Sequence, residues 1–154
     1  MLWKLRTGMS DAQKPEGGSI KHDISVPVAQ MPAFVEAVIP RVEAAFPGSR
    51  AIAFGHLGDG NVHFHVIAPA GVERASWETG EGVAISRMVY DLVCEWGGSI
   101  SAEHGIGQSK RDELERLGDP ATLDLMRKVK QALDPDELLN PGKLVTLAPP
   151  ASSA

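Results

Sequence analysis

Four of the five histidines in this chain fall in two short glycine-rich segments, where they accompany an acidic residue. The first segment, GHLGDGNVHFHV, contains His56, His63 and His65, and the second, SAEHGIG, contains Glu103 and His104. Because side chains alternate between the two faces of a strand, His63 and His65 are expected to point together, away from the apolar residues beside them. The two segments therefore predict a polar site rather than part of the core.

The residue types in these segments suit a divalent metal ion. Two imidazoles and one carboxylate bind Zn²⁺, Mn²⁺ or Fe²⁺ and leave an open position for a substrate. A tight hairpin can bring His56 and His63 within the distance that a shared ion requires. His104, next to the acidic residue, is a candidate general base, because an unperturbed imidazole titrates near neutral pH.

The direction of the His56 side chain depends on the backbone at Gly55. Strict alternation gives His56 the same parity as Ile52 and Phe54, whose apolar side chains would be expected in the core. A β-bulge at Gly55 would be needed to turn the histidine toward the polar face, and glycine is suited to that geometry.

Other polar residues have structural explanations. Asp59 is expected to form the turn, and the parity of His22 places it with the apolar residues of its strand and outside the site. Lys21 lies on the opposite, polar face of that strand and could be only a solvated charge. Cys94 is expected to be a small core residue of an apolar helix. The glycines of GHLGDG do not form the dinucleotide fingerprint, since no helix is predicted to follow them.

The elements that must position these residues alternate between strand and helix. The predicted order is a helix end at 1–13, a turn at 14–18, a strand at 20–28, a helix at 30–46 that Pro40 should kink or split, strands at 50–55 and 61–68, a helix at 81–96 and a strand at 99–102. This order predicts an α+β fold with a ferredoxin-like βαββαβ antiparallel sheet and helices on one face. Helices at 109–116 and 120–133 follow, the second with Asp119 as its N-cap.

Length and composition restrict the class of protein. The 154 residues suit one domain, and a formal charge of -5 argues against nucleic acid as a partner. No apolar run approaches the roughly 20 residues that span a bilayer, and the N-terminus has no signal-peptide pattern. A single cysteine excludes an internal disulfide and fits a reducing compartment. We therefore expect a soluble, cytoplasmic protein.

The two segments, with their surroundings, resemble a known family. LWKLR, KHDISVPV, GHLGDGNVHFHV, SAEHGIGQSKR and LDPDELLNPGK are together similar to the C-terminal domain of FAD-linked oxidases of the vanillyl-alcohol-oxidase type, over about residues 2–146. That group includes D-lactate dehydrogenases, the glycolate oxidase flavoprotein subunit and D-2-hydroxyglutarate dehydrogenases. The resemblance implies FAD, bound mainly by an N-terminal domain, and a divalent metal, Zn or Mn.

The resemblance also implies roles for the residues of the two segments. His56, His63 and Glu103 match the metal ligands of the family. His104 matches the residue that takes the proton from the substrate hydroxyl while hydride passes to the flavin. The substrate implied is a small 2-hydroxy acid, which would be oxidised to a 2-oxo acid.

Further residues match substrate and cofactor contacts of the family. Arg6 and Lys21 match groups that bind the substrate carboxylate through charge-assisted hydrogen bonds. Ser10 stands where D-2-hydroxyglutarate dehydrogenases have threonine, and His65 stands where that branch has asparagine, which leaves the substrate open. Asn140 matches a residue that lies against the flavin.

Several alternatives stay open at this stage. The chain has no counterpart of the family's FAD-binding domain, so we expect a domain at 1–146 with a disordered tail at 147–154, as a fragment or the product of a split gene. A truncated domain would expose apolar surface, so self-association as a homo-oligomer is expected. The competing functions are a stand-alone metal-dependent hydrolase or non-haem iron enzyme, a stand-alone metal-binding ferredoxin-like module, and a non-catalytic binding or regulatory module of that fold.

Overall fold

The structure, a computed structural model, describes residues 2–147, except the side chains of a few residues near the N-terminus. The chain divides into two compact units, residues 1–103 and 104–154. The first unit contains the helices and strands α1 (Leu2–Ala12), η1 (Lys14–Glu16), β1 (Ser19–Ser25), η2 (Val28–Gln30), α2 (Met31–Ala45), β2 (Arg50–His56), β3 (Asn61–Ile67), α3 (Arg74–Thr79) and α4 (Glu81–Glu95). The α+β class predicted from the sequence is confirmed.

The three strands form one antiparallel sheet with β3 in the centre, in the order β1-β3-β2. Pairing between β2 and β3 is continuous from Arg50 to His56, and it aligns His56 with Asn61 and Phe54 with His63. No bulge interrupts β2, so the expected bulge at Gly55 is not needed. Phe54, which pairs with His63, lies on the polar face and outside the core. His56 has the same parity as Phe54 and therefore faces the same side as His63.

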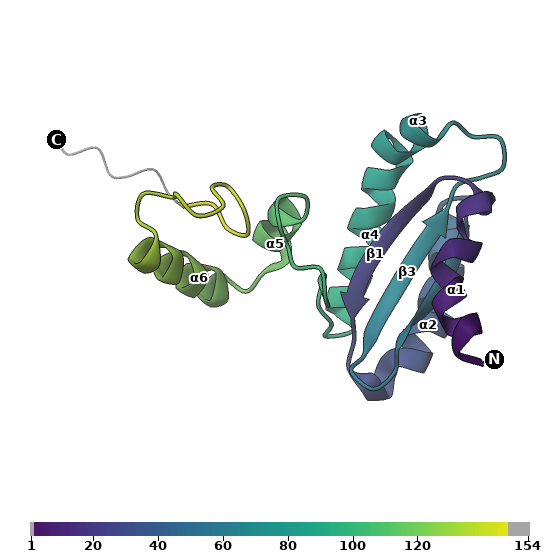
Figure 1. Cartoon of the computed structure of the whole chain (residues 1–154), viewed down its shortest axis with the longest axis horizontal. Coiled ribbons are helices and arrows are strands. Elements are labelled where there is room, and N and C mark those ends of the chain that lie inside the picture. The colour runs from purple at the N-terminus through teal and green to yellow at the C-terminus, as the bar shows by residue number, and fades with distance from the viewer. Residues whose placement is uncertain (1, 148–154) are drawn as a thin grey trace. The chain divides into compact units, whose positions relative to one another are not determined.

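The opposite face of the sheet supplies the core. Val62, Phe64 and Val66 are fully buried there, where α2 contacts β2 and α4 contacts β1 (Figure 1). His22 belongs to this face as predicted, since its ring nitrogens bond the carbonyl oxygen of Phe64 and the Ser86 hydroxyl. These contacts satisfy the hydrogen-bonding groups of a buried polar side chain. The polar residues predicted for the site lie on the other face of the sheet.

Helix α2 runs without interruption through Pro40, so the predicted split does not occur. Proline removes one helical hydrogen bond, but burial of Phe34, Val38 and Val42 against the sheet and α4 holds the helix in place. Apolar packing outweighs one missing bond.

Two predictions about the first unit need correction or reduction. Cys94 is exposed, not a core residue, because Val93 and Leu92 occupy the buried side of α4 and the cysteine is turned away from it. The strand expected at 99–102 is reduced, in the part of the chain that the structure describes, to a bridge between Ser25 and Ser99. The sheet therefore has three strands here, and the complete ferredoxin-like pattern is not formed.

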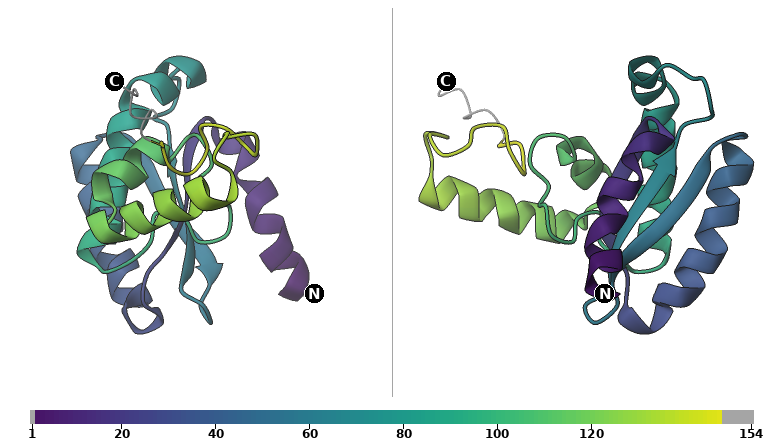
Figure 2. Two further views of the ribbon diagram at one scale, coloured as in Figure 1. Left: turned by 90° about the vertical axis from the view of Figure 1, so that its left-hand side faces the viewer. Right: turned by 45° about the vertical axis from the view of Figure 1, so that its right-hand side comes forward.

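The α1 helix lies on the side of the sheet away from α2 (Figure 2). Gln13, immediately after α1, reaches His65 on β3, with 2.5 Å between Oε1 and the imidazole Nδ1. The two helices of the predicted βαββαβ pattern, α2 and α4, lie on the core face of the sheet, and α1 partly covers the other, polar face.

The second unit contains α5 (Arg111–Leu117) and α6 (Pro120–Leu133). The Asp119 carboxylate accepts the Thr122 N–H and so caps α6 as predicted. After α6, Asp134 accepts the backbone N–H groups of Leu138 and Leu139 and pairs with Lys130. No helix within residues 2–147 is long and apolar enough to cross a membrane. Nearly all of the predicted tail, residues 148–154, lies outside the described residues.

Candidate metal and substrate site

The hairpin turn between β2 and β3 determines where the first histidine lies. The carbonyl oxygen of His56 accepts the backbone N–H groups of Asp59 and Gly60, and the Asp59 carboxylate accepts the N–H of Asn61. Gly60 has a φ of 78°, and a Cβ there would lie 2.1 Å from the Val26 carbonyl oxygen. Glycine is required at this position, and Asp59 is the turn former that the sequence predicted.

Imidazole and carboxylate groups meet at the turn end of the sheet. His56 Nδ1 lies 2.9 Å from Glu103 Oε1, and the rings of His56 and His63 are 5.7 Å apart between centroids, nearly perpendicular. The ring of Phe54 packs against that of His63, with 5.2 Å between the ring centroids. The structure thus brings the three residues predicted as metal ligands into one neighbourhood, while their role as ligands stays a prediction.

A buried carboxylate lies beneath these residues. Asp23 is 4% exposed and is the direct cross-strand neighbour of His63. Its Oδ1 accepts the side-chain amide of Asn61 at 3.1 Å, and its Oδ2 accepts the backbone N–H of Glu103 at 2.8 Å. Sequence reasoning left Asp23 out of the site, although its parity with Lys21 put it on the polar face.

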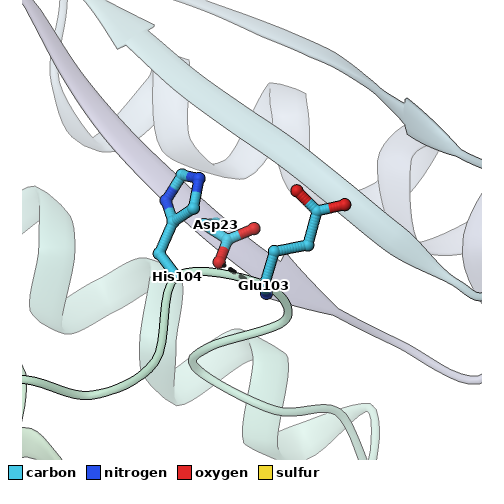
Figure 3. A group of neighbouring side chains, drawn as sticks. All are labelled: Asp23, Glu103 and His104. Atoms are coloured by element: carbon cyan, nitrogen blue, oxygen red, sulfur yellow. Dashed lines mark hydrogen bonds between the residues drawn. The ribbon is translucent and has the colours of Figure 1, made fainter.

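The donor atoms at this place fit a divalent cation. Figure 3 shows Asp23, Glu103 and the following residue His104, whose potential ligand atoms lie within 4.8 Å of one another. Two carboxylates this close repel one another unless a proton or cation lies between them. Asn61 is 2% exposed, and its Oδ1 has no hydrogen-bond partner. A buried acceptor without a donor is costly, and a cation or an ordered water would satisfy it.

His65 lies farther along the same face, across from Lys21 on β1. Burial, followed by the positive charge of Lys21 and the neighbouring His63, lowers the pKa of His65 to about 4. The imidazole is therefore neutral at neutral pH. Because the amide oxygen of Gln13 accepts from Nδ1, the lone pair of His65 is on Nε2.

The remaining predicted residues are spread over both units. Arg6 and Ser10 lie on α1, and their side chains are outside the described residues. Lys21 is exposed on the polar face of β1. Asn140 has a positive φ of 50° and lines a cavity of about 480 Å³ in the second unit with Lys130 and Lys143.

Together these features define an α+β domain with a group of side chains that could hold a metal ion. The family described as FAD linked oxidases, C-terminal domain, matches residues 1–144, and the chain belongs to this family.

Several D-2-hydroxyglutarate dehydrogenases are similar to this protein over nearly the whole chain. A D-2-hydroxyglutarate dehydrogenase of Stutzerimonas stutzeri is 38% identical over 93% of this chain and 30% of its own length. The mitochondrial enzymes with that name from Bos taurus and Arabidopsis thaliana are 35% and 34% identical over 94% of this chain. The chain spans only 25% and 24% of those two relatives. It therefore corresponds to the C-terminal part of larger oxidoreductases.

Proposed function

We propose that this chain is the substrate- and metal-binding domain of an FAD-dependent D-2-hydroxyacid dehydrogenase, which converts a 2-hydroxy acid to a 2-oxo acid. The observation that carries the proposal is the approach of His56 and Glu103 to 2.9 Å beside His63, on a sheet face that also presents Lys21. The site thus combines metal-ligand chemistry with a cation that can bind a carboxylate.

The reaction requires removal of a proton from oxygen and of a hydride from carbon. A bound divalent cation would supply Lewis acidity at the substrate hydroxyl, and the flavin would supply the hydride acceptor, which no side chain can replace. His56, His63 and Glu103 would hold the cation. The part of the relatives outside the matched region would hold the flavin.

This chain's own residues bind and orient the acid. Lys21, with Arg6 on α1, holds the substrate carboxylate through charge-assisted hydrogen bonds, and Ser10 adds a hydroxyl contact. His104 accepts the proton from the substrate hydroxyl at an imidazole nitrogen. Fixing the carboxylate and the hydroxyl together leaves one carbon–hydrogen bond presented to the acceptor.

Calorimetry on the whole chain tests this proposal. The metal-free chain is titrated with Zn²⁺ or Mn²⁺, and then with D-lactate, D-2-hydroxyglutarate or glycolate. We expect stoichiometric metal binding, and hydroxy-acid binding at least tenfold tighter in the metal-loaded chain. Joined to the flavin-holding part of a D-2-hydroxyglutarate dehydrogenase, the chain should allow a hydroxy acid to reduce the flavin. Metal-independent binding of the acid, or ester hydrolysis by the chain alone, would replace the proposal with another function.

A further inference from the structure

The position of Asp23 on β1 is unusual for a carboxylate. It lies between the core residues His22 and Ile24 in the sequence, yet its own side chain is on the polar face and only 4% exposed. Burial of an ionised carboxylate is costly unless several donors compensate for the lost hydration. The donors around Asp23 therefore indicate its role.

The Asp23 carboxylate contacts three residues of the proposed site. Oδ2 accepts the backbone N–H of Glu103 at 2.8 Å, which fixes the loop that carries this ligand. Oδ1 accepts the Asn61 amide at 3.1 Å and lies 3.8 Å from His63 Nδ1. Asp23 thus contacts Glu103 in the loop, His63 on β3 and the buried side-chain amide of Asn61.

The pairing of His63 with Asp23 resembles the way proteins orient metal-binding imidazoles, although 3.8 Å between Nδ1 and Oδ1 is an electrostatic contact and not a hydrogen bond. A histidine ligand commonly directs its second ring nitrogen at a carboxylate, which fixes the tautomer and the ring orientation. Nδ1 is the ring nitrogen of His63 that lies 3.8 Å from the Asp23 carboxylate. The other ring nitrogen, Nε2, is the atom that we assign to the cation.

The hydrogen bonds of Asp23 favour a supporting role over direct ligation. Each of its oxygens already accepts an N–H, from Asn61 and from Glu103. The Glu103 side chain carries no such constraint from Asp23 and lies 2.9 Å from His56. Asn61 donates to Asp23, so its unpartnered Oδ1 is left as an acceptor within the same buried group.

We propose that Asp23 is the positioning residue of the metal site: its carboxylate orients His63 through Nδ1 and holds the Glu103 loop, without itself binding the ion. This inference rests on the proposed metal-binding function. It adds a residue that the sequence segments did not identify and assigns a coordinating atom, Nε2, to His63.

The test compares Asp23→Asn with Glu43→Gln in the whole chain. Glu43 on α2 is a matched control, because its carboxylate accepts a strand N–H, that of Ala51, at 2.9 Å, and Ala51 lies on the core face of the sheet. Affinity for Zn²⁺ is measured by chelator competition, and the coordination sphere by the visible spectrum of the Co²⁺-saturated protein. We expect Asp23→Asn to weaken Zn²⁺ binding by about 10–100-fold with an unchanged Co²⁺ spectrum, and Glu43→Gln to match the wild type.

Each other outcome has a definite meaning. Equal affinity in Asp23→Asn and wild type would overturn the inference while leaving the proposed function intact. A changed Co²⁺ spectrum would make Asp23 a direct ligand and would also overturn it. A wild-type chain that binds no divalent ion would remove the proposed function itself.

A measurement on the wild type covers the case in which Asp23→Asn does not fold. In the Zn²⁺-loaded chain, ¹⁵N resonances of labelled histidine should show His63 protonated at Nδ1 and metal-bound at Nε2. Metal at Nδ1 would contradict the positioning role of Asp23. His22 provides an internal reference, because both of its ring nitrogens are engaged in the core.

Discussion

His56 Nδ1 and Glu103 Oε1 lie 2.9 Å apart, joining the end of β2 to the loop that follows the Ser99 bridge. Both side chains are about 40% exposed, at 40% and 43%. A side-chain contact this exposed adds little to the stability of the fold. Its geometry is more useful for function, since the same two groups can exchange their contact for a shared cation.

Replacing Glu103 by glutamine should therefore affect metal binding far more than folding. We expect Glu103→Gln to weaken Zn²⁺ affinity at least about 100-fold, because a ligand charge is lost where loss of a supporting group already costs 10–100-fold. Urea unfolding of the metal-free variant should differ from wild type by less than about 1 kcal/mol. His22→Gln is the control, with lower stability and unchanged affinity in the folded protein. Wild-type Zn²⁺ affinity in Glu103→Gln would exclude it as a ligand.

The turn residue Gly60 gives a prediction about both fold and site. Alanine there would combine a positive φ with a contact of 2.1 Å to the Val26 carbonyl, so Gly60→Ala should lower the unfolding free energy by about 2–3 kcal/mol. Metal affinity should fall as well, because the turn sets the approach of His56 to His63. Gly58 is the matched control, since a Cβ there would meet nothing within 4 Å. Equal unfolding midpoints for the two alanine variants would contradict the prediction.

Much of the first unit could be predicted because its signals are local. Alternation in KHDIS identified β1 and the core location of His22, and the glycines and Asp59 identified the turn. The prediction of a bulge at Gly55 was wrong for a physical reason. Apolar parity was taken to mean the core, but Ile52 and Phe54 lie on the site face, where Phe54 packs against His63.

The rest depends on contacts between distant parts of the chain. The register that sets Asp23 opposite His63 joins β1 to β3, and alternation within one strand does not contain that pairing. The absence of a full strand at 99–102 likewise depends on tertiary contacts. The backbone N–H of Ala102 donates to the Asp23 carbonyl oxygen, but strand pairing near Ser99 is limited to one bridge. Helix periodicity alone did not show that Cys94 faces outward.

Asp134 in the second unit gives a prediction about pH. Its hydrogen bond from Lys130, with those from Leu138 and Leu139, lowers the pKa of this carboxyl below its ordinary value of 3.8. The carboxylate therefore stabilises the folded unit fully above pH 3.8, and this contribution is lost as the pH falls through the lower, folded-state pKa. Hydrogen exchange at the Leu138 and Leu139 amides should show protection that declines only below pH 3.8.

Two variants check the assignment to Asp134. Asp134→Asn should show reduced amide protection already at neutral pH and no step on acidification. Asp124→Asn, which removes the exposed partner of Lys128, should behave as the wild type. Protection that is independent of both variants and of pH would show that other contacts hold this loop.

The neutral state of His65 leads to a prediction about substrate choice within the proposed function. Its Nδ1 is engaged by Gln13, so the lone pair of the neutral ring is on Nε2. A second carboxylate, as in D-2-hydroxyglutarate, would meet this lone pair unfavourably, whereas an asparagine amide would donate a hydrogen bond to it. We therefore expect the wild-type chain to favour a monocarboxylic 2-hydroxy acid such as D-lactate.

The substitution His65→Asn should reverse this preference. Gain of one hydrogen bond to a charged group is worth about 1.5 kcal/mol or more, so the ratio of affinities for D-2-hydroxyglutarate over D-lactate should rise about tenfold. Calorimetry on the metal-loaded chain at pH 7 measures both affinities. His65→Leu, which removes the lone pair without adding a donor, separates relief of repulsion from the new hydrogen bond and should raise the ratio less. An unchanged ratio in His65→Asn would place the distal end of the substrate away from β3, because a donor at this position would then have nothing to bind.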